Sequence, residues 1–171
     1  SYALGHASGF GVVGFHAVNL AIHASNALIA WALVRRLALR NGRDATAAGW
    51  IALASALVFA LHPLQTEAVT YASGRSTSLS TGLALASILL WIAAHEHASR
   101  LRGLQAASLL AMGMALAVKE TAVVVPAALM LWRATDPSQP ADLRSLLRAS
   151  ALHWLALLAA PLGFSVLFRA H

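Results

Sequence analysis

The chain has 171 residues, of which 59% are hydrophobic and 11% are charged, and its mean hydropathy is +0.70. This composition is too apolar for an ordinary soluble domain and indicates a membrane protein with several spans. The absence of cysteine excludes disulfides and thiolate metal sites. The net charge of +6 does not indicate a nucleic-acid partner, because the basic residues gather at the ends of apolar segments.

Six apolar segments predict six helices, at residues 12–37, 46–61, 76–94, 104–118, 121–132 and 149–168. The fourth and fifth are short halves of one span that is broken at Lys119-Glu120. Because Ser1 is not an initiator methionine, we expect the chain to begin inside a longer protein. The prediction is an all-α, polytopic transmembrane bundle of five or six membrane helices, which forms a single domain over residues 1–171.

The distribution of basic residues predicts the topology. If the first helix enters from the outer side, nine of the 12 Lys and Arg residues fall on the inner side, as the positive-inside rule requires. The nine are Arg35, Arg36, Arg40, Arg43, Arg100, Arg102, Arg133, Arg144 and Arg148. The outer ends then hold Arg75, Lys119 and Arg169. We therefore expect the uncommon polar residues to converge on the outer face of the membrane.

A polar stripe runs along the first predicted helix. His16, Asn19, His23 and Asn26 recur at spacings of three or four residues, which places them on one helix face. The stripe could join neighbouring helices through hydrogen bonds, or its outer members could line a polar substrate cavity. A metal or haem site is a weaker interpretation, because His16 and His23 lie about 10 Å apart along the axis.

The stretch from His62 to Arg75 lies between two apolar segments and holds His62, Glu67 and Arg75. Pro63 is expected to end the preceding helix, and Thr66-Glu67 to begin a short new one. An arginine beside a membrane surface suits a phosphate, because its planar fork binds two oxygens. Glu67 could act as a base, hold a divalent ion or only neutralise Arg75. We interpret the stretch as a re-entrant or surface-lying active loop.

Two other polar groups have simpler interpretations. Lys119 is a candidate phosphate partner at the outer interface, and Glu120 could balance its charge. His153 and Trp154 fit an anchor at the membrane interface.

Residues 12–132 resemble the membrane half of the TMTC proteins, which are transmembrane and tetratricopeptide-repeat O-mannosyltransferases with bacterial relatives. The resemblance rests on the histidine–asparagine stripe, on His62-Pro63-x-x-Thr66-Glu67-Ala68-Val69 with Gly74-Arg75, and on Lys119-Glu120 with Pro126. It implies a GT-C-type fold and an enzyme that uses a lipid-phosphate-linked sugar on the outer or lumenal face. For a bacterial relative, that is the periplasmic face of the inner membrane.

The resemblance also implies roles for residues. Arg75 and Lys119 would contact the lipid phosphate, while Glu67 and His62 would shape the sugar or acceptor site and are the candidate catalytic residues. The other candidate substrate-binding residues are Glu120, His16, Asn19, His23 and Thr66. The family carries an acidic motif in its first outer loop, whereas no Asp or Glu precedes His16 here, and tetratricopeptide repeats are absent. We therefore expect the 171 residues alone to be inactive.

The leading hypothesis is a fragment of a GT-C-like glycosyltransferase whose partners are membrane lipid, a lipid-linked sugar and an acceptor protein. A divalent metal is an option, and no cofactor is certain. The alternative is a non-catalytic subunit packed against other membrane proteins. It rests on the missing acidic loop and on small-residue segments such as Ala47-Ala48-Gly49 and residues 84–87. A transporter or a cofactor-binding helical protein is a third hypothesis.

Overall fold

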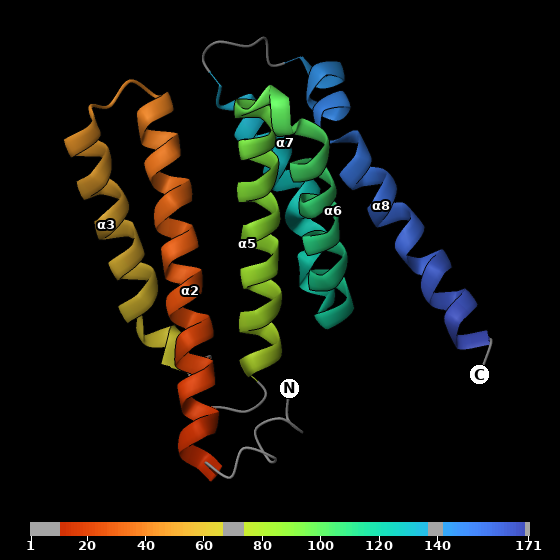
Figure 1. Ribbon diagram of the computed structural model, residues 1–171, viewed down its shortest axis with the longest axis horizontal. Coiled ribbons are helices and arrows are strands. Elements are labelled where there is room, and N and C mark those ends of the chain that lie inside the picture. The colour runs from red at the N-terminus through yellow and green to blue at the C-terminus, as the bar shows by residue number, and fades with distance from the viewer. Residues whose placement is uncertain (1–10, 67–73, 137–141, 170–171) are drawn as a thin grey trace. The chain divides into compact units, whose positions relative to one another are not determined.

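The computed structural model describes residues 11–66, 74–136 and 142–169, and every regular element in these ranges is a helix (Figure 1). The α-helices are α2 (Gly11–Arg40), α3 (Ala45–Leu61), α5 (Gly74–Glu96), α6 (Leu101–Val118), α7 (Val125–Ala134) and α8 (Leu143–Arg169). Short 3-10 helices cover Pro63–Gln65 (η1), Ala98–Arg100 (η2) and Glu120–Val124 (η3). Five predicted apolar segments each lie in one α-helix, and the segment 121–132 covers the end of η3 and most of α7. The all-helical prediction is confirmed.

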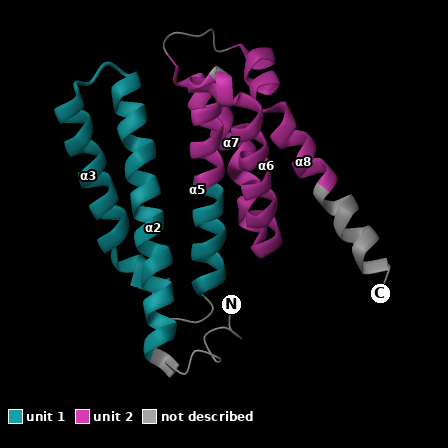
Figure 2. Ribbon diagram, viewed as in Figure 1, with its two compact units in different colours: residues 1–85 teal, residues 86–171 magenta. Residues whose placement is uncertain are grey.

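Three of the described helices are long and apolar enough to cross a membrane, namely Val13–Arg40, Gly74–Glu96 and Leu101–Val118. Ala45–Leu61 is a shorter apolar helix. The chain divides into two compact units, residues 1–85 and residues 86–171 (Figure 2). The first holds α2, α3 and the first half of α5, and the second holds the rest. The predicted single domain over residues 1–171 stays a prediction.

Small residues let α2 and α3 pack side by side in the first unit (Figure 1). Ala48, Ala52 and Ala56 recur every four residues along α3, and all three are buried. Because the alanine side chain is a single methyl group, the two helix backbones can approach closely and gain dispersion contacts. Such contacts matter in a membrane, where the hydrophobic effect contributes little to the association of helices. The alanines of α3 therefore form its contact face.

Local signals set the connector between these two helices. Gly42 has a φ of 78°, and the Arg43 N–H donates to the Ala38 carbonyl at 3.1 Å, which closes the end of α2. This is the turn that Asn41-Gly42 predicts, since glycine adopts positive φ without strain. Asp44 then caps α3, and its carboxylate accepts the Thr46 and Ala47 N–H groups at 2.9 Å each.

Two predicted helix ends are confirmed. His62 has extended backbone in front of Pro63, as a residue before proline prefers, and α3 ends there. Lys119 is also extended, with a φ of −160°, and separates α6 from η3. The broken span at Lys119-Glu120 is therefore present. Thr66 is helical, and Glu67 lies outside the described residues.

The core of the second unit comes from α6, α7 and α8: α8 contacts both α6 and α7, and η3 contacts both as well. Met112 and Ala115 of α6, and Val125 and Leu129 of α7, are almost fully buried. The spacings of three and four residues give each helix one apolar face toward this core.

The Asp44 cap is expected to make the stability of α3 depend on pH. The hydrogen bond from the Ala47 N–H, followed by that from Thr46, lowers the pKa of this carboxyl below its ordinary value. A lowered folded-state pKa stabilises the protein above the unfolded-state pKa, and this contribution is lost as the pH falls through the folded-state value. Thermal unfolding in detergent should therefore show a larger acid destabilisation for the wild type than for Asp44→Asn, whose neutral amide still caps the helix. Parallel pH profiles would contradict this prediction.

Candidate functional site

Arg75 is buried in the first turn of α5, where its guanidinium contacts α2. Its Nε donates to Asn19 Oδ1 at 2.7 Å, and its Nη2 donates to the Phe15 carbonyl oxygen at 3.1 Å. The Cζ atom lies 3.8 Å from the centroid of the Phe15 ring. A short charge-assisted hydrogen bond and a cation–π contact thus hold one cation in a fixed orientation.

The sequence of α2 explains this arrangement. Phe15 and Asn19 are four residues apart, so they lie on the same face, one turn above the other. Asn19 is fully buried, and its amide oxygen supplies an acceptor where water is excluded. Because arginine stays protonated in proteins, the positive charge is retained at this position. The site therefore presents a permanent, preorganised cation at the end of the His62–Arg75 stretch.

The rest of the stripe joins α2 to both neighbours in the first unit. His23 Nε2 donates to the Ala60 carbonyl of α3 at 3.1 Å, and its ring stacks on Phe59 with centroids 5.4 Å apart. Asn26 Nδ2 donates to the Ser78 carbonyl of α5 at 2.8 Å. These contacts favour the helix-joining interpretation of the stripe. They also occupy His23 Nε2, one of the two nitrogens that a haem iron could bind.

Three further predicted residues of the first unit, His16, His62 and Thr66, are exposed. His16 lies on the exposed side near the start of α2. His62 Nδ1 accepts the Leu64 N–H at 3.2 Å and so caps η1, while Thr66 Oγ1 donates to the Pro63 carbonyl at 2.7 Å. Glu67, the predicted base, lies outside the described residues. The catalytic roles of His62 and Glu67 stay predictions.

Lys119 and Glu120 belong to the second unit, at the break between α6 and η3. Lys119 is half-buried, and its backbone N–H donates to the Ala115 carbonyl at 2.9 Å, which ends α6. Glu120 is exposed in the first turn of η3. The ranges described contain no group of three His, Cys, Asp or Glu residues arranged to hold a metal ion.

Sequence reasoning missed a second polar cluster, which lies in the second unit. Ser87 and Ser108 exchange hydrogen bonds from each hydroxyl to the other's carbonyl oxygen, at 2.8 and 2.7 Å. With both hydroxyl protons used in this way, His153 Nε2 donates to Ser108 Oγ, 2.8 Å away. The prediction of His153 as an interfacial anchor is wrong, because the ring is 1% exposed and joins α8 to α6. The sequence signal that could have indicated this cluster is the presence of single polar residues within otherwise apolar helices.

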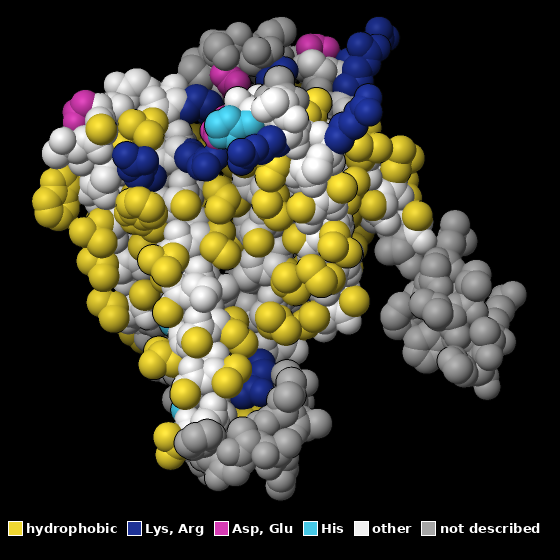
Figure 3. Space-filling view, viewed as in Figure 1, with side chains coloured by type: hydrophobic (Ala, Val, Ile, Leu, Met, Phe, Trp, Pro, Cys, Tyr) yellow, Lys and Arg dark blue, Asp and Glu magenta, His cyan; other side chains and the backbone are white. Residues whose placement is uncertain are grey.

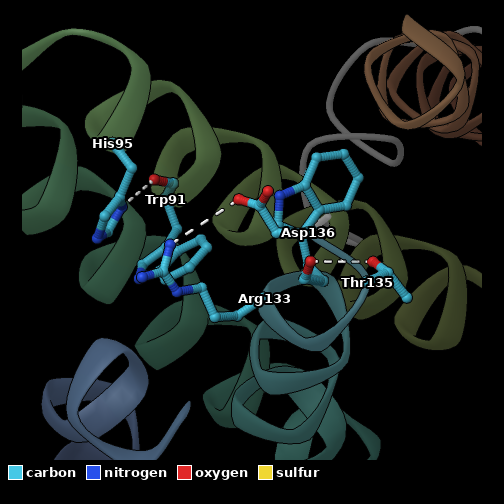
Figure 4. A network of polar contacts seen from close by, with 6 residues as sticks. Trp91, His95, Arg133, Thr135 and Asp136 are labelled. Carbon is cyan, nitrogen blue, oxygen red and sulfur yellow. Dashed lines mark hydrogen bonds and ion pairs between the residues drawn. The ribbon is translucent and has the colours of Figure 1, made fainter. Parts of the chain in front are cut away.

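A further set of polar contacts lies near the end of α5 and at the end of α7 (Figure 4). Trp91 is buried, and its Nε1 donates to the Ala149 carbonyl of α8 at 3.3 Å. His95 Nδ1 donates to the Trp91 carbonyl at 2.8 Å. The centroids of the His95 and Trp91 rings are 4.1 Å apart, and the ring planes are inclined by 40°. Arg133 and Asp136 form an ion pair of 3.9 Å three residues apart. These contacts are structural, and they involve none of the predicted site residues.

Comparison with known proteins gives one partial match. The chain is similar to the protein O-mannosyl-transferase Tmtc3 of Drosophila melanogaster, with 39% identity over 89 residues. The match covers 44% of this chain and 10% of the fruit-fly protein. No family model and no solved structure matches the chain. The similarity supports a relation to the TMTC-like proteins and to a glycosyltransferase-like membrane protein.

Gly82 of α5 is required for the close approach of Asn26. A Cβ at Gly82 would collide with Asn26 Oδ1, whose amide is buried and hydrogen-bonded. We expect Gly82→Ala to lower the free energy of unfolding by about 1–2 kcal/mol, since overpacking outweighs the gain in helix propensity. The matched control is Gly113→Ala in α6, where a Cβ meets no atom within 4 Å and stability should rise. Equal effects of the two substitutions on thermal unfolding in detergent would contradict the contact.

Asn19→Ala removes the acceptor from the buried Nε of Arg75. We expect a loss of about 1.5–3 kcal/mol, the range for a hydrogen bond to a charged group. Ser25→Ala is the control on the same helix, because Ser25 is exposed and its hydroxyl donates to the Ala21 carbonyl of its own helix. Its effect should stay within about 0.5 kcal/mol. Denaturant titration in detergent would measure the free energy of unfolding of both variants. An Asn19 variant as stable as the Ser25 variant would contradict the prediction.

Proposed function

We propose that this chain is the membrane region of a glycosyltransferase that takes its sugar from a lipid-phosphate donor at the outer face of the membrane. The observation that carries the proposal is the cation of Arg75, buried and fixed by Asn19 and Phe15 beside the His62–Arg75 stretch. The similarity to the fruit-fly O-mannosyl-transferase supports the reaction class. Because the chain spans a tenth of that protein, the activity belongs to the longer protein. The bacterial inner membrane stays a prediction.

In the proposed reaction, an acceptor hydroxyl attacks the anomeric carbon and forms the new glycosidic bond. The bond between that carbon and the phosphate oxygen breaks, and the lipid phosphate leaves with the electron pair. Arg75 stabilises the negative charge that develops on this phosphate. The phosphate contact expected of Lys119, in the second unit, stays a prediction. The hydroxyl proton passes to a base, for which Glu67 and His62 are the candidates. A fixed guanidinium is suited to this task, since it needs no reorganisation as the charge develops.

The non-catalytic subunit remains the alternative hypothesis. The small residues that motivated it already have neighbours within the chain: Ala48 is buried, and Ser87 bonds Ser108. These two residues therefore serve contacts within the chain rather than a surface for another membrane protein. Copurification with unrelated membrane proteins in a fixed ratio would favour this alternative.

Arg75→Ala in the full-length protein tests the proposed function. We expect membranes that carry this variant to transfer sugar from a lipid-linked mannose donor about 100- to 1,000-fold more slowly, as for loss of a group that stabilises the transition state. Arg75→Lys should recover only part of the rate, because an ammonium lacks the two-pronged fork.

Asn26→Ala is the matched control, because it also removes a bond between α2 and α5 but changes no charge. Its rate per folded molecule should stay within a few-fold of the wild type. An Arg75→Ala enzyme with unchanged turnover would refute the role of the cation. Equal losses in the two variants would assign Arg75 to structure alone.

A further inference from the structure

An apolar groove runs between α2 and α3 in the first unit. It has a volume of about 680 Å³, and residues of α2 and α3 from Ala27 to Trp31 and from Ala45 to Ala60 line it. Trp31, Trp50 and Leu53 are among them. From Ala45 to Ala60, the α3 wall of the groove is about 22 Å long, which exceeds one leaflet of about 15 Å. Its length and lining suit one acyl chain of a lipid.

Basic residues surround the connector end of this groove. Arg35 lies one turn beyond Trp31 on α2, and its Cζ is 5.8 Å from the centroid of the Trp31 ring. Arg43 is exposed and lies just before Ala45 and Thr46, which line the groove at its connector end. Hydrophobic side chains cover this face of α2 and α3, with Lys and Arg side chains at its connector end (Figure 3).

One acidic residue, Asp44, directly follows Arg43, and the positive charge of Arg43 is among the causes that lower the pKa of this carboxyl. Asp44 therefore offsets part of the charge of Arg43, and a single carboxylate cannot balance both Arg35 and Arg43. Asp44 is committed to the N-terminus of α3, where it accepts two backbone N–H groups. Within the ranges that the structure describes, Arg35 forms no ion pair, and its described contact is with the Trp31 ring. The connector therefore keeps an excess of positive charge directly beside an apolar groove.

We propose that this groove binds one anionic phospholipid, with its phosphate on Arg35 and Arg43 and one acyl chain between α2 and α3. The charge complementarity selects an anionic headgroup, and the apolar lining selects a lipid rather than a free anion. The predicted inner location of the connector agrees with this choice, since anionic lipids attract basic segments at the cytoplasmic leaflet. This site is separate from Arg75 and does not depend on the proposed transferase activity.

Native mass spectrometry of the full chain in detergent tests the site. The probes are phosphatidylglycerol and phosphatidylcholine with identical oleoyl chains. We expect the anionic lipid to bind more tightly, and the Arg35→Gln/Arg43→Gln variant to lose about 25-fold in its affinity, or about fivefold for each arginine. The control Arg144→Gln/Arg148→Gln removes the same charge from exposed positions of α8 and should change this affinity less than twofold. Equal binding of the two lipids, or equal losses in the two variants, would overturn the proposal.

A second variant tests the acyl chain. Gly49 lines the groove, and a Cβ there meets no atom within 4 Å, so the leucine of Gly49→Leu starts in open space and extends into the groove. It should reduce phosphatidylglycerol binding at least tenfold, whereas Gly113→Leu, equally unobstructed on α6, should leave it unchanged. Circular dichroism would verify that both variants stay helical. Unchanged lipid binding by Gly49→Leu, or full competition by inorganic phosphate, would show that no acyl chain occupies the groove.

Discussion

A cation buried between two apolar helices constrains the first unit more than any other group. Arginine stays charged in proteins, so a buried arginine needs hydrogen-bond acceptors and a polarisable surface close to its guanidinium. Asn19, the Phe15 carbonyl and the Phe15 ring supply them from a single helix face. The start of α5 is thereby held against α2, at the end of the stretch that carries His62 and Thr66. The residue proposed to meet the lipid phosphate therefore also joins its own helix to α2.

Helix α2 uses two kinds of contact for its two neighbours. Against α3 it packs small side chains, which bring the backbones together and need little specificity beyond alanine at every fourth position. Against α5 it uses hydrogen bonds from Asn19 and Asn26, together with the bare surface of Gly82. Hydrogen bonds have strict geometry, so they fix the register of α5 on α2. Precise placement is what a residue that meets a substrate requires.

The second unit follows the same rule with different residues. Ser87, Ser108 and His153 satisfy one another's hydrogen bonds across α5, α6 and α8. A partly satisfied cluster of this kind would be costly in a dry interior, whereas a complete one specifies a single packing. Trp91 adds a bond to α8. Polar residues inside these apolar helices therefore serve helix pairing in both units, and a lone histidine in such a helix is weak evidence for chemistry.

Local chemistry allowed the helices and their ends to be predicted from the amino-acid sequence. Asn41-Gly42, Pro63 and Lys119-Glu120 act through their own backbone preferences, so they require no knowledge of the neighbours. The sequence also singled out Arg75 and the polar stripe as exceptional in apolar surroundings. Only the tertiary structure decided that Asn19 binds Arg75, that Phe15 lies against it, and that His153 is buried. Those outcomes depend on which helix face a neighbour covers, and a periodic pattern identifies a face without identifying its partner.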